Sequence, residues 1–127
     1  MERKYLMTGF GYAIVGLLLG MHMAASHNHV QMPTHAHIML VGFVVSVIYA
    51  IAYKLWLPAD SGATGMGKAQ YWAHQLGTLG LVVGLYSMYS GMMPGETIGP
   101  VLGVFSLITF IGLVLMKVML IKATKAS

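Results

Sequence analysis

Apolar residues fill four long runs of the chain, and short stretches of turn-forming residues separate these runs. The apolar runs cover about residues 5–25, 34–57, 69–90 and 98–120, and the separating stretches cover 27–33, 58–67 and 91–95. Each run is close to the ~20 residues that an α-helix needs to cross the hydrocarbon core of a bilayer. The separating stretches contain the glycine, proline, asparagine and serine typical of turns. The pattern therefore predicts an all-α integral membrane protein, a bundle of four transmembrane helices forming one domain over residues 1–127.

The composition agrees with lipid as the main surrounding of the chain. Of its 127 residues 57% are hydrophobic and 8% are charged, and the mean hydropathy is +0.76. A water-soluble domain of this size cannot bury so much apolar surface, because a large share of a small domain stays at its surface. We therefore expect the lipid bilayer to be a partner of most of the chain.

The positive charges predict the orientation of the four helices. All seven basic residues precede the first run, flank the second loop or lie near the end of the fourth run: Arg3, Lys4, Lys54, Lys68, Lys117, Lys122 and Lys125. Lys and Arg concentrate on the cytoplasmic side of membrane proteins. We therefore expect both termini in the cytoplasm and the other two loops outside, in a bacterial inner (plasma) membrane. The basic residues form no basic face, so no nucleic acid partner is expected.

The first run has an alternative interpretation as a signal peptide. Basic residues precede the apolar stretch, and Ala24, Ala25 and Ser26 resemble a small-residue cleavage site. However, the apolar run is longer than the ~7–15 residues usual for the core of a signal peptide. We therefore expect the run to remain in the protein as its first span.

Glycines four residues apart occur in three of the predicted spans. The pairs are Gly16 and Gly20, Gly80 and Gly84, and Gly99 and Gly103. Such spacing lets helix backbones approach closely in lipid. The pairs are compatible with a compact bundle and with an oligomer.

Five of the six histidines fall within sixteen positions of the chain, at His22, His27, His29, His35 and His37. In the predicted topology they gather at the periplasmic surface. No acidic residue occurs between Arg3 and Ala59, so no carboxylate nearby would pair these imidazoles as cations. Neutral imidazoles are ligands for haem iron, copper and zinc. The cluster therefore predicts a haem or metal site. The chain has no cysteine, so a haem would be bound non-covalently.

His35 and His37 are predicted to serve two separate sites. Pro33 suits the first turn of a helix, and helical positions two residues apart point about 200° apart. The stripe that continues from His35 is the more polar one, and its Gly42 leaves room for a flat ring. The stripe that continues from His37 is aliphatic and should meet lipid, a porphyrin or another subunit. The two stripes consist of Met39, Gly42, Ser46, Tyr49 and Tyr53, and of Val41, Val44, Ile48, Ile51 and Leu55.

The other histidines allow a second kind of site. His27 and His29 fall in a predicted loop, where an extended H-x-H would aim both rings at one ion. His22 and the thioether of Met32 lie close by in the chain, and this mixture of ligands suits copper, with zinc as an alternative. His74 stands alone near the cytoplasmic end of the third run. We expect it to be a packed or interfacial histidine, or a contact to a separate site.

Several stretches of the first three runs resemble the haem–copper oxidase subunit I superfamily. The stretch Thr34-His-Ala-His-Ile-Met-Leu-Val-Gly-Phe43 resembles helices of that subunit. Together with Ala25-Ser-His-Asn-His29, Tyr53-Lys-Leu-Trp-Leu-Pro58 and Lys68-Ala-Gln-Tyr-Trp-Ala-His-Gln-Leu-Gly77, it is similar to short four-span relatives of subunit I. The resemblance reaches to about Gly77.

The resemblance implies a haem b site shared between subunits. Full-length subunit I has twelve spans in three quasi-equivalent groups of four, and one of its helices carries a His-x-His that faces two haems. By this match His37 corresponds to a ligand of the low-spin haem and His35 to a histidine that faces a second haem. A homotrimer of four-span chains would mimic the twelve-helix subunit, with a haem between His37 of one copy and His35 of the next.

The departures from the family limit what carries over. The chain has neither the His-x-x-x-Tyr nor the His-His element that holds the catalytic copper, and Glu2, Asp60 and Glu96 are its only acidic residues. We therefore expect a bis-histidine haem b protein with an electron-transfer or redox role. We do not expect oxygen reduction coupled to proton pumping. Two alternatives remain open. One is a copper- or zinc-binding membrane protein that uses the outer His and Met residues, and the other is a non-catalytic assembly subunit.

Overall fold

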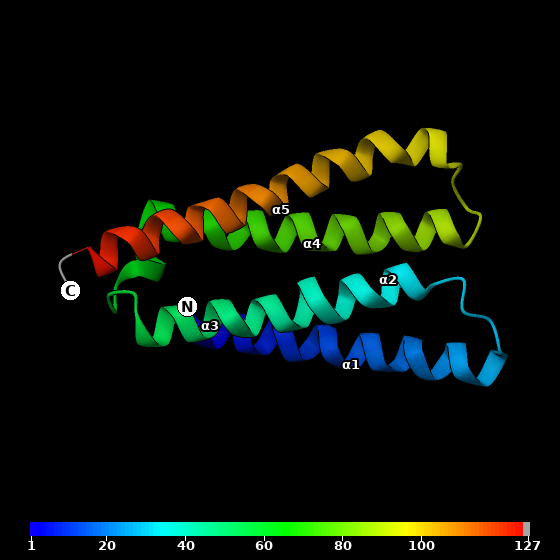
Figure 1. The fold of residues 1–127 in the computed structure, drawn as a ribbon, viewed down its shortest axis with the longest axis horizontal. Helices are drawn as coiled ribbons and strands as arrows, with labels where there is room; N and C mark the ends of the chain where they lie inside the picture. Colours follow the sequence, from blue (N-terminus) through cyan, green and yellow to red (C-terminus); the bar gives the residue numbers. More distant parts are fainter. Residues whose placement is uncertain (126–127) are drawn as a thin grey trace.

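The computed structural model describes residues 1–125, and these residues form four helical rods with no β-strand among them (Figure 1). The first rod is α1 (Glu2–Ser26). The second is continuous through α2 (Met32–His37), the π-helical segment η1 (Ile38–Val44) and α3 (Val45–Leu55). A 3₁₀ turn, η2 (Ser61–Ala63), leads to α4 (Gly65–Tyr89), and α5 (Gly95–Thr124) is the fourth rod. The all-α prediction is confirmed.

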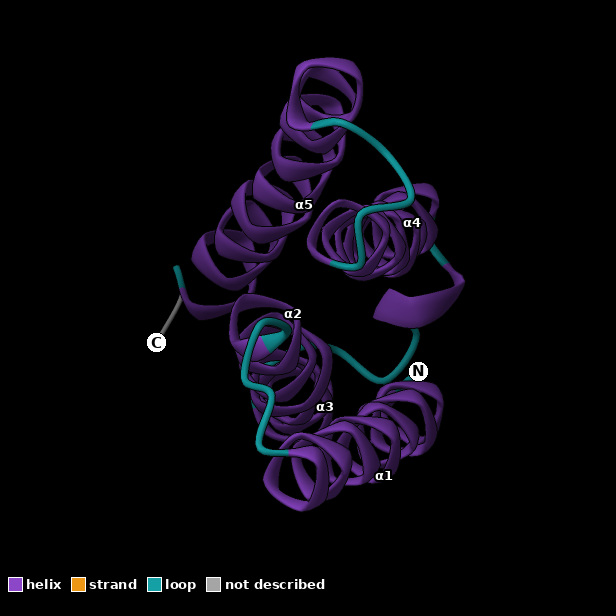
Figure 2. Ribbon diagram, turned by 90° about the vertical axis from the view of Figure 1, so that its right-hand side faces the viewer, coloured by secondary structure: helices purple, strands orange, loops and turns teal. Residues whose placement is uncertain are grey.

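The rods pack as two antiparallel helical hairpins. The rod from α2 to α3 lies along α1, and α5 lies along α4 (Figure 1). The start of α1, the end of α5 and the segment between α3 and α4 lie at one end of the molecule, and the loops 27–31 and 90–94 lie at the other (Figure 1). Figure 2 looks along the molecule from the second end and shows α5 inclined to the other helices. The molecule therefore has a termini end, where the core around Tyr5, Tyr49 and Tyr53 lies, and a histidine end.

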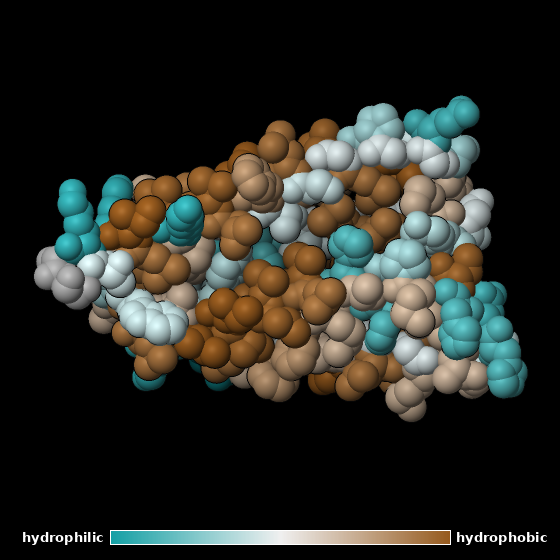
Figure 3. Space-filling model, viewed as in Figure 1, coloured by the Kyte–Doolittle hydropathy of each residue, from teal (hydrophilic) through white to brown (hydrophobic). Residues whose placement is uncertain are grey.

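Three of the rods are long and apolar enough to cross a membrane. They are α1, the second rod and α5, with 25, 24 and 30 residues. Large apolar side chains on their outer faces are exposed, among them Leu18, Ile48 and Phe110. Figure 3 shows hydrophobic residues across the middle of one face, with hydrophilic residues concentrated toward the two ends. This distribution is that of an integral membrane protein, as predicted.

The remaining rod, α4, matches the others in length but is less apolar. It has 25 residues, and its polar side chains Gln70, His74 and Thr78 are completely buried inside the bundle. A polar residue that faces the interior lowers the hydropathy of a helix without meeting lipid. The lower hydropathy of α4 therefore reflects its packed face.

Two of the three glycine pairs lie at helix contacts. A Cβ at Gly16 would come 2.5 Å from Sδ of Met39, and a Cβ at Gly84 would come 2.6 Å from Leu102. By contrast, a Cβ at Gly99 or Gly103 would meet no atom within 4 Å. The first two pairs thus bring α1 against the second rod and α4 against α5, and the third lies on an open surface.

The helix α4 begins within the stretch that the sequence predicts as a loop. Thr64 is its N-cap, and the Thr64 hydroxyl accepts a hydrogen bond of 3.0 Å from the backbone N–H of Gly67. A threonine cap satisfies a free N–H group of the first turn. Gly67 is required there, because a Cβ would clash with the carbonyl oxygen of Ser61. Gly67 therefore marks a close contact at the start of a helix.

Candidate functional site

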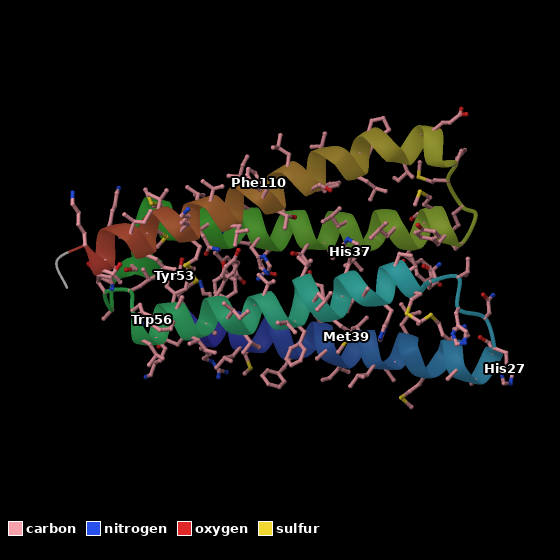
Figure 4. The ribbon with its side chains drawn as sticks, in the orientation of Figure 1. His27, His37, Met39, Tyr53, Trp56 and Phe110 are labelled. Carbon is pink, nitrogen blue, oxygen red and sulfur yellow. The ribbon has the colours of Figure 1, made fainter. Side chains whose placement is uncertain are left out.

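The six histidines divide by their burial. His22, His27 and His29 are exposed toward the histidine end, as is Met32, and His35 and His37 are half-buried on α2. His74 lies at the middle of α4 and is completely buried. Figure 4 labels His27 at the tip of this end and His37 farther along the second rod. His74 is therefore a packed histidine, which is one of the two interpretations open from the sequence.

The ring of His35 points toward α1. Its Nδ1 lies 2.8 Å from the carbonyl oxygen of Gly16. Its Cε1 lies 3.0 Å from the position that a Cβ would take at Gly20. The pair of glycines on α1 therefore forms the surface on which this imidazole rests.

The ring of His37 belongs to the other side of the rod. Its Nδ1 lies 2.8 Å from the carbonyl oxygen of Pro33, one turn earlier in the same helix. Figure 4 labels His37 and Met39 on opposite sides of the second rod. The two imidazoles of one chain thus do not converge on one point.

Both hydrogen bonds fix the same tautomer. A carbonyl oxygen only accepts hydrogen bonds, so the Nδ1 of each ring carries the hydrogen and donates it. The Nε2 of each neutral ring then has a free lone pair. A histidine that binds a metal commonly donates its other ring N–H to a backbone carbonyl in this way, which orients the ring. In His35 and His37, Nε2 is the ring nitrogen that these hydrogen bonds do not use.

The stripes that continue from the two histidines differ as the sequence predicts. On the His35 stripe Gly42, Ser46, Tyr49 and Tyr53 are buried, and on the His37 stripe Val44, Ile48, Ile51 and Leu55 are exposed. The first stripe faces the interior of the bundle. The second stripe is an apolar outer surface, open to lipid or to another protein.

The flat ring beside Gly42 belongs to the chain itself. A Cβ at Gly42 would come 2.6 Å from Cγ and 2.9 Å from Cβ of Tyr12, a residue of α1. The sequence predicts room for a planar group at this glycine, and Tyr12 fills it. The space expected for a planar ligand at Gly42 is therefore occupied by a side chain of the same chain.

The outer loop does not form a three-ligand metal site within one copy of the described chain. No group of three or more His, Asp or Glu side chains in residues 1–125 is arranged to hold an ion. His27 has φ = 54° and ends α1 in the left-handed conformation, with its N–H bonded to Ala24. The extended H-x-H geometry considered from the sequence is thus absent at His27, and ligands for an ion would have to come from more than one chain or from a rearranged loop.

A buried polar cluster lies nearer the termini end, and the sequence analysis did not identify it. The Gln70 Oε1 accepts hydrogen bonds from the hydroxyls of Tyr5 and Tyr53, and the Gln70 Nε2 donates one of 3.3 Å to the carbonyl oxygen of Gly112. One side chain of α4 thereby joins α1, α3 and α5. The four-residue spacing of Gln70, His74 and Thr78 places all three on one face of a helix, and this was the available signal.

The π-helical segment follows His37 directly. A π-turn contains one more residue than an α-turn, and short π segments occur often at functional sites. Here the segment covers the part of the second rod that packs on α1 around Gly42. It therefore sets how the histidine-bearing turn, α2, is rotated relative to the buried tyrosines of α3.

No family model, no curated protein and no solved structure matches this chain. Its function must therefore be argued from its own residues.

Proposed function

We propose that the protein is a membrane-bound haem b protein with an electron-transfer role, in which His35 and His37 of different copies provide the two axial ligands. The observation that carries the proposal is the pair of hydrogen bonds from the Nδ1 atoms to backbone carbonyls, each 2.8 Å long. With Nδ1 engaged in this way, Nε2 is the ring atom that would bind haem iron. Two imidazoles fill the axial positions of the iron and leave none for oxygen.

The arrangement of the rings supports a site between copies. His35 is directed to α1, and His37 begins an exposed apolar stripe on the opposite side of the rod. One haem cannot bind both rings of one chain in this geometry. The resemblance to subunit I of the haem–copper oxidases favours a homotrimer, in which twelve spans surround the shared sites. A haem bound there would supply a one-electron couple.

The chain's own residues would hold and shield such a group. The aliphatic stripe that includes Val44 and Ile48 would pack against the porphyrin or the neighbouring copy and exclude water from it. The carbonyls of Gly16 and Pro33 would fix the orientation of the two rings. In a four-span topology with cytoplasmic termini, α4 is the third span, and the histidine end faces the periplasm of a bacterial inner membrane.

Visible spectra of the purified protein test this proposal. The chain is produced in cells supplied with haem, purified in mild detergent, and measured oxidised and reduced beside a metal analysis. We expect a bis-histidine haem b spectrum with little carbon monoxide binding. The spectrum should disappear in His35→Ala and in His37→Ala and persist in the matched control His22→Ala, because His22 is exposed on α1.

Coexpression of His35→Ala and His37→Ala, the two variants expected to lack haem, tests whether the ligands come from different copies. In a trimer assembled at random from equal amounts of His35→Ala and His37→Ala chains, about a quarter of the interfaces combine an intact His37 with an intact His35. Haem should therefore return to about a quarter of the wild-type amount. No recovery would exclude the shared site.

The alternatives give different results in the same preparations. Copper or zinc bound without porphyrin, and lost in His27→Ala or His29→Ala, would favour the metal-binding alternative. A preparation that contains neither metal nor haem would overturn the haem proposal. The assembly subunit would then be the remaining alternative.

A further inference from the structure

Two buried polar atoms on one face of α4 have no hydrogen-bond partner within residues 1–125. They are Nδ1 of His74 and Oγ1 of Thr78, and both side chains are completely buried. The other ring nitrogen of His74, Nε2, lies 2.9 Å from the hydroxyl of Ser46 on α3. The imidazole is therefore bonded on one side only, although it lies in the middle of the bundle.

Leaving these atoms unpaired would be costly. A buried polar group without a partner costs about 1–3 kcal/mol, and more than about 90% of buried polar groups in proteins are paired. The cost applies to His74 and to Thr78 separately. Two such atoms near one another indicate a bound molecule that pairs both.

The spacing of the two residues suits a single small molecule. Side chains four residues apart in a helix are neighbours on one face, with Cβ atoms about 5–6 Å apart. A molecule that makes two hydrogen bonds of about 2.8 Å spans such a distance. Tyr49 and Tyr5 close the other sides of the imidazole, with ring centroids 5.0 and 5.7 Å from it.

The chemistry of the two atoms selects the ligand. If Ser46 donates to Nε2, Nδ1 carries the hydrogen and needs an acceptor. If Nε2 donates to Ser46, Nδ1 has a lone pair and needs a donor. The Thr78 hydroxyl both donates and accepts. A cation is unsuitable, because residues 61–95 contain no acidic residue and the His74 ring lies against the uncharged side chains of Ser46, Tyr5 and Tyr49. A water molecule satisfies every requirement.

We propose that one ordered water molecule binds between Nδ1 of His74 and Oγ1 of Thr78. Buried waters of this kind make about three hydrogen bonds and behave as part of the structure. The water continues the polar face of α4 from Gln70 through His74 to Thr78, and it holds the imidazole in one orientation against Ser46. The site is independent of any haem.

Solid-state NMR of the protein in liposomes tests the site directly. With ¹⁵N-labelled histidine, magnetisation should pass from water to the His74 ring, which His74→Gln identifies by loss of its signal. The transfer should be lost in Thr78→Val, which has the same shape but no hydroxyl. It should be retained in Thr78→Ser, which keeps the hydroxyl.

Thermal unfolding in detergent gives a second readout. Thr78→Val should lower the midpoint by about 5 °C, because it removes the water and leaves His74 unpaired. The matched control Thr109→Val should change it little, since the Thr109 hydroxyl bonds only to the carbonyl of Phe105 in its own helix. If Thr78 is truly unpaired, Thr78→Val will instead be neutral or stabilising. That result, an absent water signal in the wild type, or a signal that persists in Thr78→Val would each overturn the proposal.

Discussion

At the scale of single residues, main-chain carbonyls determine what the imidazoles of α2 are able to do. The carbonyl oxygens of Gly16 and Pro33 hold the Nδ1–H groups of His35 and His37. The first of these contacts also requires close packing, because the ring of His35 lies against Gly20. Main-chain carbonyls therefore orient the two rings without help from any carboxylate. Two members of the histidine cluster are thus oriented although the cluster has no acidic neighbours.

Gly42 offers a residue-scale prediction about the packing behind His35. The Gly42→Ala variant would place a methyl group 2.6 Å from Cγ of Tyr12, near the fixed base of that ring. The ring cannot swing away without moving α1, so we expect the free energy of unfolding to fall by about 1–3 kcal/mol. Denaturant or thermal unfolding in detergent, followed by circular dichroism, measures this loss.

Gly11 provides the matched control for Gly42. Both are helical glycines in apolar rods, but a Cβ at Gly11 meets no atom within 4 Å. Alanine is the better helix former, so Gly11→Ala should leave the stability unchanged or raise it by up to about 1 kcal/mol. Equal losses in the two variants would show that the contact with Tyr12 does not limit the packing.

The same glycine shows where sequence reasoning ends. The position of Gly42 among polar and aromatic residues of one stripe predicts that a flat ring approaches it. The pattern does not show which ring does so, because Tyr12 comes from another helix and is 30 residues away in the chain. The buried pairing of Gln70 with Tyr5 and Tyr53 was missed for a related reason. Tyr5 lies 65 residues from Gln70 in the chain and Tyr53 lies 17 residues from it, and only the packing of the helices brings them together.

At the scale of elements, the apolar pattern predicts the four helices well but not the change of geometry inside one of them. The predicted runs 5–25 and 98–120 lie within α1 and α5, and Pro33 lies in the first turn of α2 as expected. The π segment Ile38–Val44 has no signature in the apolar pattern, which is apolar throughout that stretch. A π-helix turns through a smaller angle per residue than an α-helix, and this difference does not change which residues are hydrophobic.

Removing one residue tests the role of the π segment. Deletion of Leu40, which is exposed, should convert Ile38–Val44 into a regular α-helix. A π-turn holds one residue more than an α-turn, so the flanking faces stay in register. We therefore expect this variant to keep its helix content and its unfolding temperature within a few degrees, as measured by circular dichroism in detergent.

The corresponding deletion in α3 should behave differently. Ile48 is also exposed, but α3 has no extra residue to lose. Its deletion rotates everything before it by about 100° relative to Tyr49 and Tyr53, so Ser46 and Gly42 leave the packed face. The bundle should lose most of its cooperative unfolding. If both deletions lower the stability equally, the π segment does not contain a residue that the fold can lose.

At the scale of the whole molecule, the fold separates the basic residues from the exposed histidines. Both termini and the segment between α3 and α4 lie at one end, and the basic residues belong to this half of the molecule (Figure 1). The other end carries the exposed histidines. The arrangement of the helices follows from the alternation of apolar runs and turns. By contrast, the apolar pattern does not distinguish a helix surface that meets lipid from one that meets another protein, because both surfaces are apolar.

Labelling of single cysteines tests the four-span topology. The chain has no cysteine of its own, so Ser26→Cys, Ala59→Cys and Ser90→Cys each introduce a unique thiol at an exposed position. If α4 crosses the membrane, a membrane-impermeant maleimide added to spheroplasts should label Cys variants at 26 and 90. The variant at 59 should react only after the membrane is opened.

The crucial comparison is between positions 59 and 90, which flank α4. If both react from the same side, α4 does not span the bilayer and its buried Gln70, His74 and Thr78 belong to a helix that lies within or beside the membrane. If they react from opposite sides, the polar face of α4 crosses the membrane with its side chains enclosed by the other three rods.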